Sequence, residues 1–168
     1  MDLRTTNNNS ASYESLHRAM IFLFFVAGAL LSKSFFLTVC QGEDELLLQL
    51  LSWIVPLGAA LVLSASVLGT ALLPLGAMVY GGICGANAEQ LMLAYYSGAE
   101  TDLKSLAVLM AVVPVFFLVA VKGMGTSELL NAMLDNSSQP NRAAYNREYI
   151  PLMIIVMATI LALYVIIG

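Results

Sequence analysis

Side chains that carry out chemistry are scarce in this chain. Its single histidine, His17, precedes the first apolar run, so no Ser/His pair can form within the apolar runs, and an HExxH motif or a two-histidine metal site would need a second histidine. A GxxxxGKS/T phosphate-binding loop is missing, and no polar stretch is long enough to fold as a separate enzyme domain. The sequence predicts a protein that is not an enzyme and has neither a metal site nor another cofactor.

Cysteine is also scarce, and its spacing gives no metal site. Cys40 and Cys84 are the two cysteines, and neither belongs to a CxxC or Cys/His cluster. We interpret both as structural. The topology given below places both toward the outer ends of their helices, which leaves a disulfide between them open.

Charge is the third scarcity, and it decides the class of protein. Only 11% of the 168 residues are charged, whereas about 25% is usual in soluble domains. Hydrophobic residues make up 60% of the chain, and the mean hydropathy is +0.84. The net charge of −4 and the missing basic patch exclude nucleic acid as a partner. The composition indicates an integral membrane protein, whose first partner is the lipid bilayer.

Apolar stretches follow a polar beginning. A helix needs about 20 residues to cross roughly 30 Å of hydrocarbon. We expect residues 1–18 to form a disordered cytoplasmic tail and residues 19–168 a single transmembrane domain, an all-α polytopic bundle of about five helices. The expected spans are residues 19–39, 46–68, 71–86, 103–121 and 149–167.

The connections between spans are predicted from turn residues and polarity. A helix from residue 46 to residue 85 would be roughly 60 Å long, so we expect a break between Gly69 and Pro74. Residues 87–102 are interpreted as an amphipathic segment that lies on the outer interface or dips into it. Residues 123–148 are polar, and SELLNAML within them predicts two helical turns lying on the membrane.

Basic residues predict the orientation. Five of them fall in segments on one side, and only Lys104 falls in a segment on the other side. Cytoplasmic segments carry an excess of Lys and Arg, so we expect a cell-membrane protein with its amino terminus inside and its carboxyl terminus outside. The five inner residues are Arg4, Arg18, Lys122, Arg142 and Arg147.

Two charged residues lie in or beside the expected spans. Lys33 falls within the first span and Glu89 directly follows the third. Charges at such places often mark an ion path. Both are within reach of the outer interface, so Lys33 reaching to the headgroups, or pairing with Glu89, is the other interpretation.

Small residues recur at four-residue spacing in the third span. Ala77, Gly81 and Gly85 would stack on one face of a helix and leave a groove that another helix backbone can approach closely. The spacing indicates a helix-packing face, and it leaves open whether this face also binds a partner.

Residues 64–121 resemble the stage II sporulation protein M family. The resemblance is carried by Leu68-Gly69-Thr70, Pro74, Gly81 and Gly85, followed after the outer loop by a span with an internal proline, Pro114. It implies a non-catalytic membrane scaffold that recruits peptidoglycan hydrolases during engulfment in sporulation. The alternative is a small transporter, or the substrate-binding membrane subunit of one. Other membrane proteins and further copies of the chain are the partners that remain open.

Overall fold

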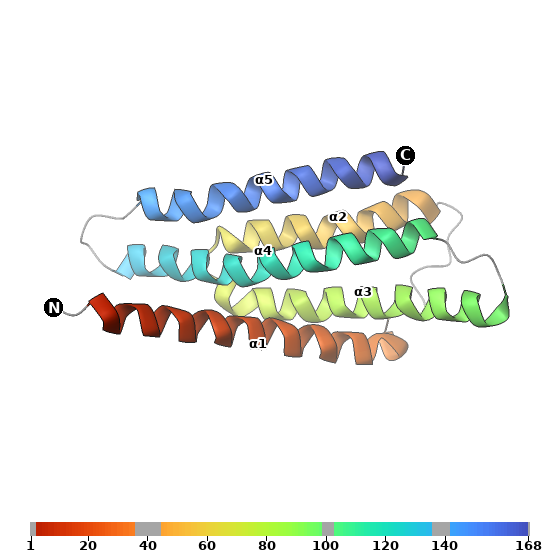
Figure 1. The fold of residues 1–168 in the computed structure, drawn as a ribbon, viewed down its shortest axis with the longest axis horizontal. Coiled ribbons are helices and arrows are strands. Elements are labelled where there is room, and N and C mark those ends of the chain that lie inside the picture. Colours follow the sequence, from red (N-terminus) through yellow and green to blue (C-terminus); the bar gives the residue numbers. More distant parts are fainter. Residues whose placement is uncertain (1–2, 36–44, 99–102, 136–141, 168) are drawn as a thin grey trace.

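Five helices make up the described residues of the computed structural model, and they run alternately up and down along one long axis (Figure 1). The structure describes residues 3–35, 45–98, 103–135 and 142–167, with side chains outside the description for 3–13, 33–35, 45–52, 103–105, 135, 142, 166 and 167. The helices are α1 (Leu3–Phe35), α2 (Glu45–Ser64), α3 (Gly69–Ser97), α4 (Leu103–Asp135) and α5 (Arg142–Ile167).

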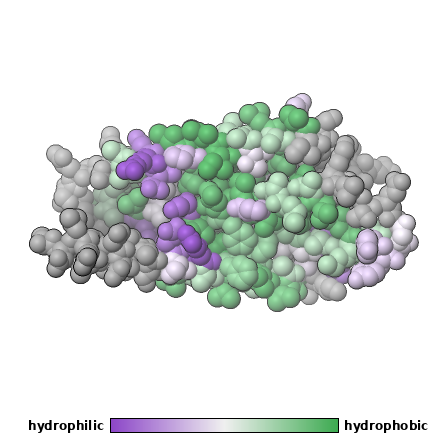
Figure 2. All heavy atoms as spheres, viewed as in Figure 1, coloured by the Kyte–Doolittle hydropathy of each residue, from purple (hydrophilic) through white to green (hydrophobic). Residues whose placement is uncertain are grey.

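The all-α membrane architecture predicted from the sequence is confirmed. Within the described residues, four helices are long and apolar enough to cross a membrane. The remaining expected span corresponds to α2, whose 20 residues would extend about 30 Å. Figure 2 shows an apolar band across the middle of the molecule and hydrophilic residues gathered toward the end where α1 begins. The four apolar stretches are Glu14–Ser32, Gly69–Ser97, Leu106–Leu134 and Ala143–Val165.

Four helices are longer than expected, because polar residues continue them beyond the apolar runs; α5 is one of them, since it begins at Arg142 rather than at residue 149. Helix α1 begins at Leu3, so the expected disordered tail is helical from there. Helix α3 continues through most of the expected interface segment to Ser97, and Gly98 caps it with a left-handed φ of 71° and an N–H that donates to the carbonyls of Ala94 and Tyr95. Helix α4 runs to Asp135, so SELLNAML forms its last turns rather than a separate helix on the membrane.

The turn between α2 and α3 also differs from the expected break. It comprises residues 65–68, and Gly69 and Pro74 both belong to α3. The chain reverses here through short-range hydrogen bonds, among them Ser66 N–H to the Leu63 carbonyl at 3.0 Å. A Cβ on Gly69 would meet the Leu63 carbonyl oxygen and the Ser127 side chain, so close packing, rather than flexibility, calls for glycine at this position.

The closest helix contact joins α1 to α3, which run in the same direction side by side (Figure 1). A Cβ on Gly28 would collide with the Met78 carbonyl oxygen, and one on Gly81 would collide with the Phe25 carbonyl oxygen. At Gly85 the added atom would lie 2.8 Å from the Ala29 carbonyl oxygen. The groove formed by Ala77, Gly81 and Gly85 is therefore filled by α1 of the same chain.

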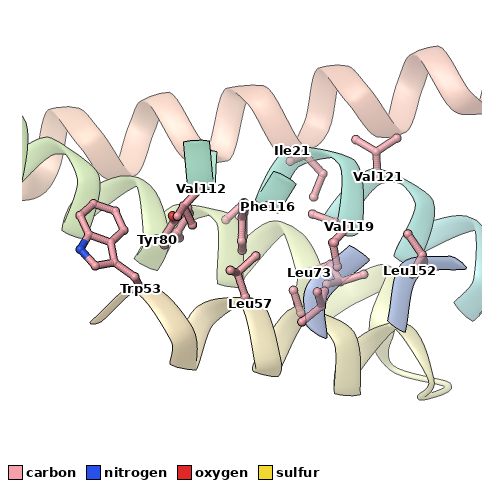
Figure 3. Close-up of a cluster of buried hydrophobic side chains, with 14 of the residues drawn as sticks. Ile21, Trp53, Leu57, Leu73, Tyr80, Val112, Phe116, Val119, Val121 and Leu152 are labelled. Atoms are coloured by element: carbon pink, nitrogen blue, oxygen red, sulfur yellow. The ribbon is translucent and has the colours of Figure 1, made fainter. Parts of the chain in front are cut away.

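An aromatic cluster forms the centre of the bundle (Figure 3). The Tyr80 ring lies 4.2 Å from the Phe116 ring and 6.2 Å from the Trp53 ring, between centroids. All three side chains are buried, and they come from α3, α4 and α2. Tilted and edge-on ring pairs of this kind add about 0.5–1.5 kcal/mol each beyond the area they bury. The cluster therefore ties three helices together at mid-bundle.

The Gly81→Ala variant tests the α1–α3 contact. Its methyl group has no room beside the Phe25 carbonyl, because helix backbone cannot yield as a flexible side chain can. We expect a loss of about 1–3 kcal/mol in unfolding free energy, measured by denaturant titration in detergent micelles. Gly76→Ala on the same helix is the control, because its Cβ meets nothing within 4 Å. Equal stability of the two variants would contradict the close contact.

Candidate functional site

The most developed polar arrangement in the described residues lies where the α2–α3 turn meets α4. We call it the inner junction, where inner refers only to the end of the bundle at which α1 begins (Figure 1), and it comprises residues 64–70 together with Thr126, Ser127 and Asn131. A tight reversal between two helices leaves carbonyls without partners at the end of the first and N–H groups without partners at the start of the second. Side chains of α4 form hydrogen bonds with several of these carbonyl and N–H groups.

Three side chains of α4 form the hydrogen bonds of the inner junction. Thr126 Oγ1 shares its one proton between the Ser64 carbonyl and the Gly123 carbonyl of its own helix, each at 2.9 Å, and Asn131 Nδ2 donates to the Val67 carbonyl at 3.1 Å. Ser127 Oγ donates to the Ser66 carbonyl at 2.7 Å and accepts from the Thr70 N–H at 3.2 Å. Thr126 and Ser127 are fully buried, so their bonds are largely shielded from water, whereas the Asn131 bond is exposed.

Glycine allows α4 to approach the turn. A Cβ on Gly123 would lie 2.7 Å from the Ser64 Cβ and 3.2 Å from Leu73 Cδ1. Because Gly123 has no side chain, the hydroxyls one turn later on α4 come within hydrogen-bonding distance of the turn. In the sequence, this site corresponds to GMGTSELLN, which begins at Gly123, and to the uncharged turn ASVL that lies opposite it. Sequence reasoning assigned that stretch to a surface helix and missed it.

Ion pairs join α1 to α4 at the same end of the bundle. His17 Nε2 lies 2.9 Å from Glu128 Oε1, and His17 is almost fully buried. Glu14 Oε1 accepts from Arg18 Nη2 at 2.8 Å and lies 3.2 Å from Lys122 Nζ. The Glu14 side chain is 38% exposed, and those of Arg18 and Lys122 are 67% and 48% exposed. This trio therefore lies at the protein surface.

Two polar atoms at the centre of the bundle lack a hydrogen-bond partner among the described residues. They are the Trp53 indole nitrogen and the Tyr80 hydroxyl, and both side chains are buried in the aromatic cluster (Figure 3). Cys84, one turn beyond Tyr80 on α3, offers only a weak sulfur acceptor. An unpartnered buried hydroxyl destabilises a fold by about 1–3 kcal/mol. The cluster is thus held by packing rather than by its polar atoms.

The carboxyl-terminal end of α3 exposes an aromatic pair. Tyr95 and Tyr96 are 72% and 82% exposed, with their ring centroids 5.8 Å apart, and Met92 and Leu93 are exposed one turn earlier. Figure 1 shows α3 reaching beyond the neighbouring ends of α2, α4 and α5. These side chains therefore extend past the packed part of the bundle.

The charged pair predicted from the sequence is placed only in part. Glu89 lies half-buried on α3, whereas the Lys33 side chain lies outside the described residues. The contacts of Phe25 with Gly81 and of Ala29 with Gly85 each join positions 56 apart in the chain. The same register brings positions 33 and 89 to one level of the helices. Pairing of Lys33 with Glu89 stays a prediction.

One of the two cysteines lies within the described residues. Cys84 is a buried free thiol, and Cys40 lies outside the described residues. No group of three or more His, Cys, Asp or Glu side chains within metal-binding reach occurs in the part of the chain that the structure describes. The buried polar residues of that part are His17, Ser32, Ser64, Thr126 and Ser127, and all except Ser32 belong to the inner end.

Comparisons with protein-family models, with curated proteins and with solved structures give no match for this chain.

The Thr126→Val variant tests the inner junction. Valine keeps the shape of threonine but leaves the buried Ser64 carbonyl without its donor from α4. We expect a loss of about 1 kcal/mol in unfolding free energy, measured by denaturant titration in detergent. Thr159→Val on α5 is the matched control, because Thr159 bonds only to the Ile155 carbonyl of its own helix. An equal loss of unfolding free energy in Thr159→Val would show that the hydrogen bond between α4 and the turn adds no stability beyond that of a bond within one helix.

The Tyr80→Phe variant tests the unpartnered hydroxyl. It keeps the ring stacking and removes a buried polar atom that has no partner. We expect the thermal unfolding midpoint to rise, by the equivalent of about 1 kcal/mol. Tyr164→Phe, at a largely exposed position on α5, should leave the midpoint unchanged. A lower midpoint for Tyr80→Phe would mean that the hydroxyl has a partner, such as a buried water.

Proposed function

We propose that this protein is a non-catalytic membrane scaffold that presents the outer end of α3 to an enzyme of peptidoglycan remodelling. The observation that carries the proposal is the exposed pair Tyr95 and Tyr96 on a helix that extends beyond the rest of the bundle. Tyrosine and methionine are enriched where proteins bind one another. An exposed helix end is already folded before binding, so it loses less conformational entropy on docking than a mobile loop does.

The interior of the bundle supports a scaffold more than a transporter. Transport needs polar groups along a path through the membrane. In the described residues, buried polar side chains lie mostly at the inner end, and the middle is filled by Trp53, Tyr80, Phe116 and their apolar neighbours. The groove of Ala77, Gly81 and Gly85 is also taken by α1, so a partner would have to use another surface.

The distribution of charge supports the orientation within the proposal. The basic residues Arg18, Lys122 and Arg147 lie at the end of the bundle where α1 begins, which the positive-inside rule assigns to the cytoplasm. The outer end of α3 then lies on the far side of the cell membrane, where peptidoglycan is found. The proposal agrees with the resemblance of residues 64–121 to the stage II sporulation protein M family, and it assigns the recruiting role to α3.

Photocrosslinking from position 96 tests the proposal in the native membrane. A photoreactive residue replaces Tyr96, and the crosslinked peptides are identified by mass spectrometry. We expect peptides of a peptidoglycan hydrolase. The double variant Tyr95→Ala/Tyr96→Ala should reduce recovery of that enzyme with the tagged full-length protein by at least tenfold, since paired aromatic anchors often contribute more than 2 kcal/mol.

Tyr164→Ala is the matched control for this experiment. Tyr164 is also largely exposed, on α5 toward the same end of the molecule, but it lies outside the aromatic pair. Recovery of the hydrolase should be unchanged in this variant. Crosslinks only to further copies of the chain or to an ATPase, with no wall-remodelling enzyme, would overturn the proposal in favour of an oligomer or of a transporter subunit.

A further inference from the structure

A groove between α1 and α4 opens on the surface at the inner end of the bundle. It has a volume of about 610 Å³, and three charged residues form one end of it: Glu14, Arg18 and Lys122. The remainder of its lining is apolar, with Phe22 and Leu118 exposed on its walls. The apolar lining residues are Ala19, Phe22, Phe117, Leu118 and Val121.

The polar and apolar ends of the groove are arranged along the membrane normal. On α1, Glu14, Arg18 and Phe22 follow one another at four-residue spacing and so lie on one face. On α4, which runs in the opposite direction, Leu118 lies one turn deeper than Lys122. The rise from Glu14 to Phe22 is about 12 Å, at 1.5 Å per residue. The groove therefore changes from charged to apolar in the direction that leads into the bilayer.

The charged end of the groove has N–H donors that Glu14 does not use. Arg18 uses one N–H on Glu14, and Lys122 is directed to the same carboxylate oxygen. A guanidinium has five N–H donors and an ammonium three, so the contacts seen among the described residues use only a minority of them. Two cations and one carboxylate also leave a net positive charge at this end. An anionic group with several oxygens, attached to a hydrocarbon chain, complements both the charge and the shape.

We propose that this groove binds an anionic phospholipid, with its phosphate at Arg18 and Lys122 and an acyl chain along Phe22, Phe117 and Leu118. Basic pockets between membrane helices on the cytoplasmic side are known to hold anionic headgroups. Glu14 holds the two cations together at the surface while no lipid is bound, because it pairs with both. This inference does not depend on the proposed scaffold function, and it concerns the opposite end of the molecule.

The test uses the full-length protein in nanodiscs of mixed phosphatidylglycerol and phosphatidylcholine, followed by native mass spectrometry of bound lipid. We expect phosphatidylglycerol to be retained preferentially. The double variant Arg18→Gln/Lys122→Gln should reduce the preference for retained phosphatidylglycerol by about 25-fold, since each cation near an anionic surface contributes about a fivefold preference. Arg142→Gln/Arg147→Gln, which removes the same charge from α5, should leave retention unchanged.

A second measurement needs no variant. Phosphatidylglycerol with a photoreactive acyl chain, added to the wild-type protein, should label peptides that contain residues 14–22 and 117–122. Labelling confined to α3 or α5, equal loss of lipid in both double variants, no preference over phosphatidylcholine, or displacement of the lipid by millimolar inorganic phosphate would each overturn the proposal. Retention of the preference in Arg18→Gln/Lys122→Gln would do the same.

Discussion

The bundle depends on the direct backbone contact between α1 and α3. Lipid surrounds apolar helices as favourably as other helices do, so the hydrophobic effect alone does not hold spans together. Association requires close packing over a large area, and Gly28 and Gly81 allow it by letting each helix approach a carbonyl of the other. The aromatic cluster extends this contact, because Phe25 of α1 packs near Tyr80 of α3, which in turn contacts Phe116 of α4.

The inner junction supplies hydrogen-bond partners to the backbone of the α2–α3 turn. The α2–α3 turn pairs part of its backbone internally, for example Gly69 N–H with the Ser66 carbonyl, but its remaining carbonyl and N–H groups need other partners, because unpaired groups are costly where water is excluded. Hydroxyl and amide groups of α4 satisfy them, and these bonds connect the helical hairpin to a third helix. By contrast, the buried side chains of α5 in the described residues are apolar, among them Leu152, Val156 and Leu163. The polar bonds fix the direction of α4 against the turn, whereas α5 is held by packing.

The number and type of helices follow from the sequence, because apolar runs of spanning length have few other structures available. The ends of the helices do not follow, since polar residues such as Asn87 continue a helix when they bond to its own backbone, here to the Ile83 carbonyl. The four-residue spacing of Ala77, Gly81 and Gly85 predicts a packing face on α3, but it does not tell that α1 is the helix that packs there, because that contact joins residues distant in the chain. The inner junction escaped prediction for the same reason: Thr126 and Ser127 acquire their partners only when α4 lies against a turn some sixty residues earlier in the chain.

The parallel pairing of α1 with α3 has a consequence for the order of membrane insertion. In the described residues, α1 contacts α3 and α4 but not α2, its neighbour in the chain. The first helix therefore enters the bilayer well before the glycine face of its partner has been synthesised. Until then, the glycine face of α1 is open to lipid or to the insertion machinery. A contact that forms late in synthesis leaves more time for incorrect helix pairing. The native contact between α1 and α3 can therefore form only after α3 has been inserted into the membrane.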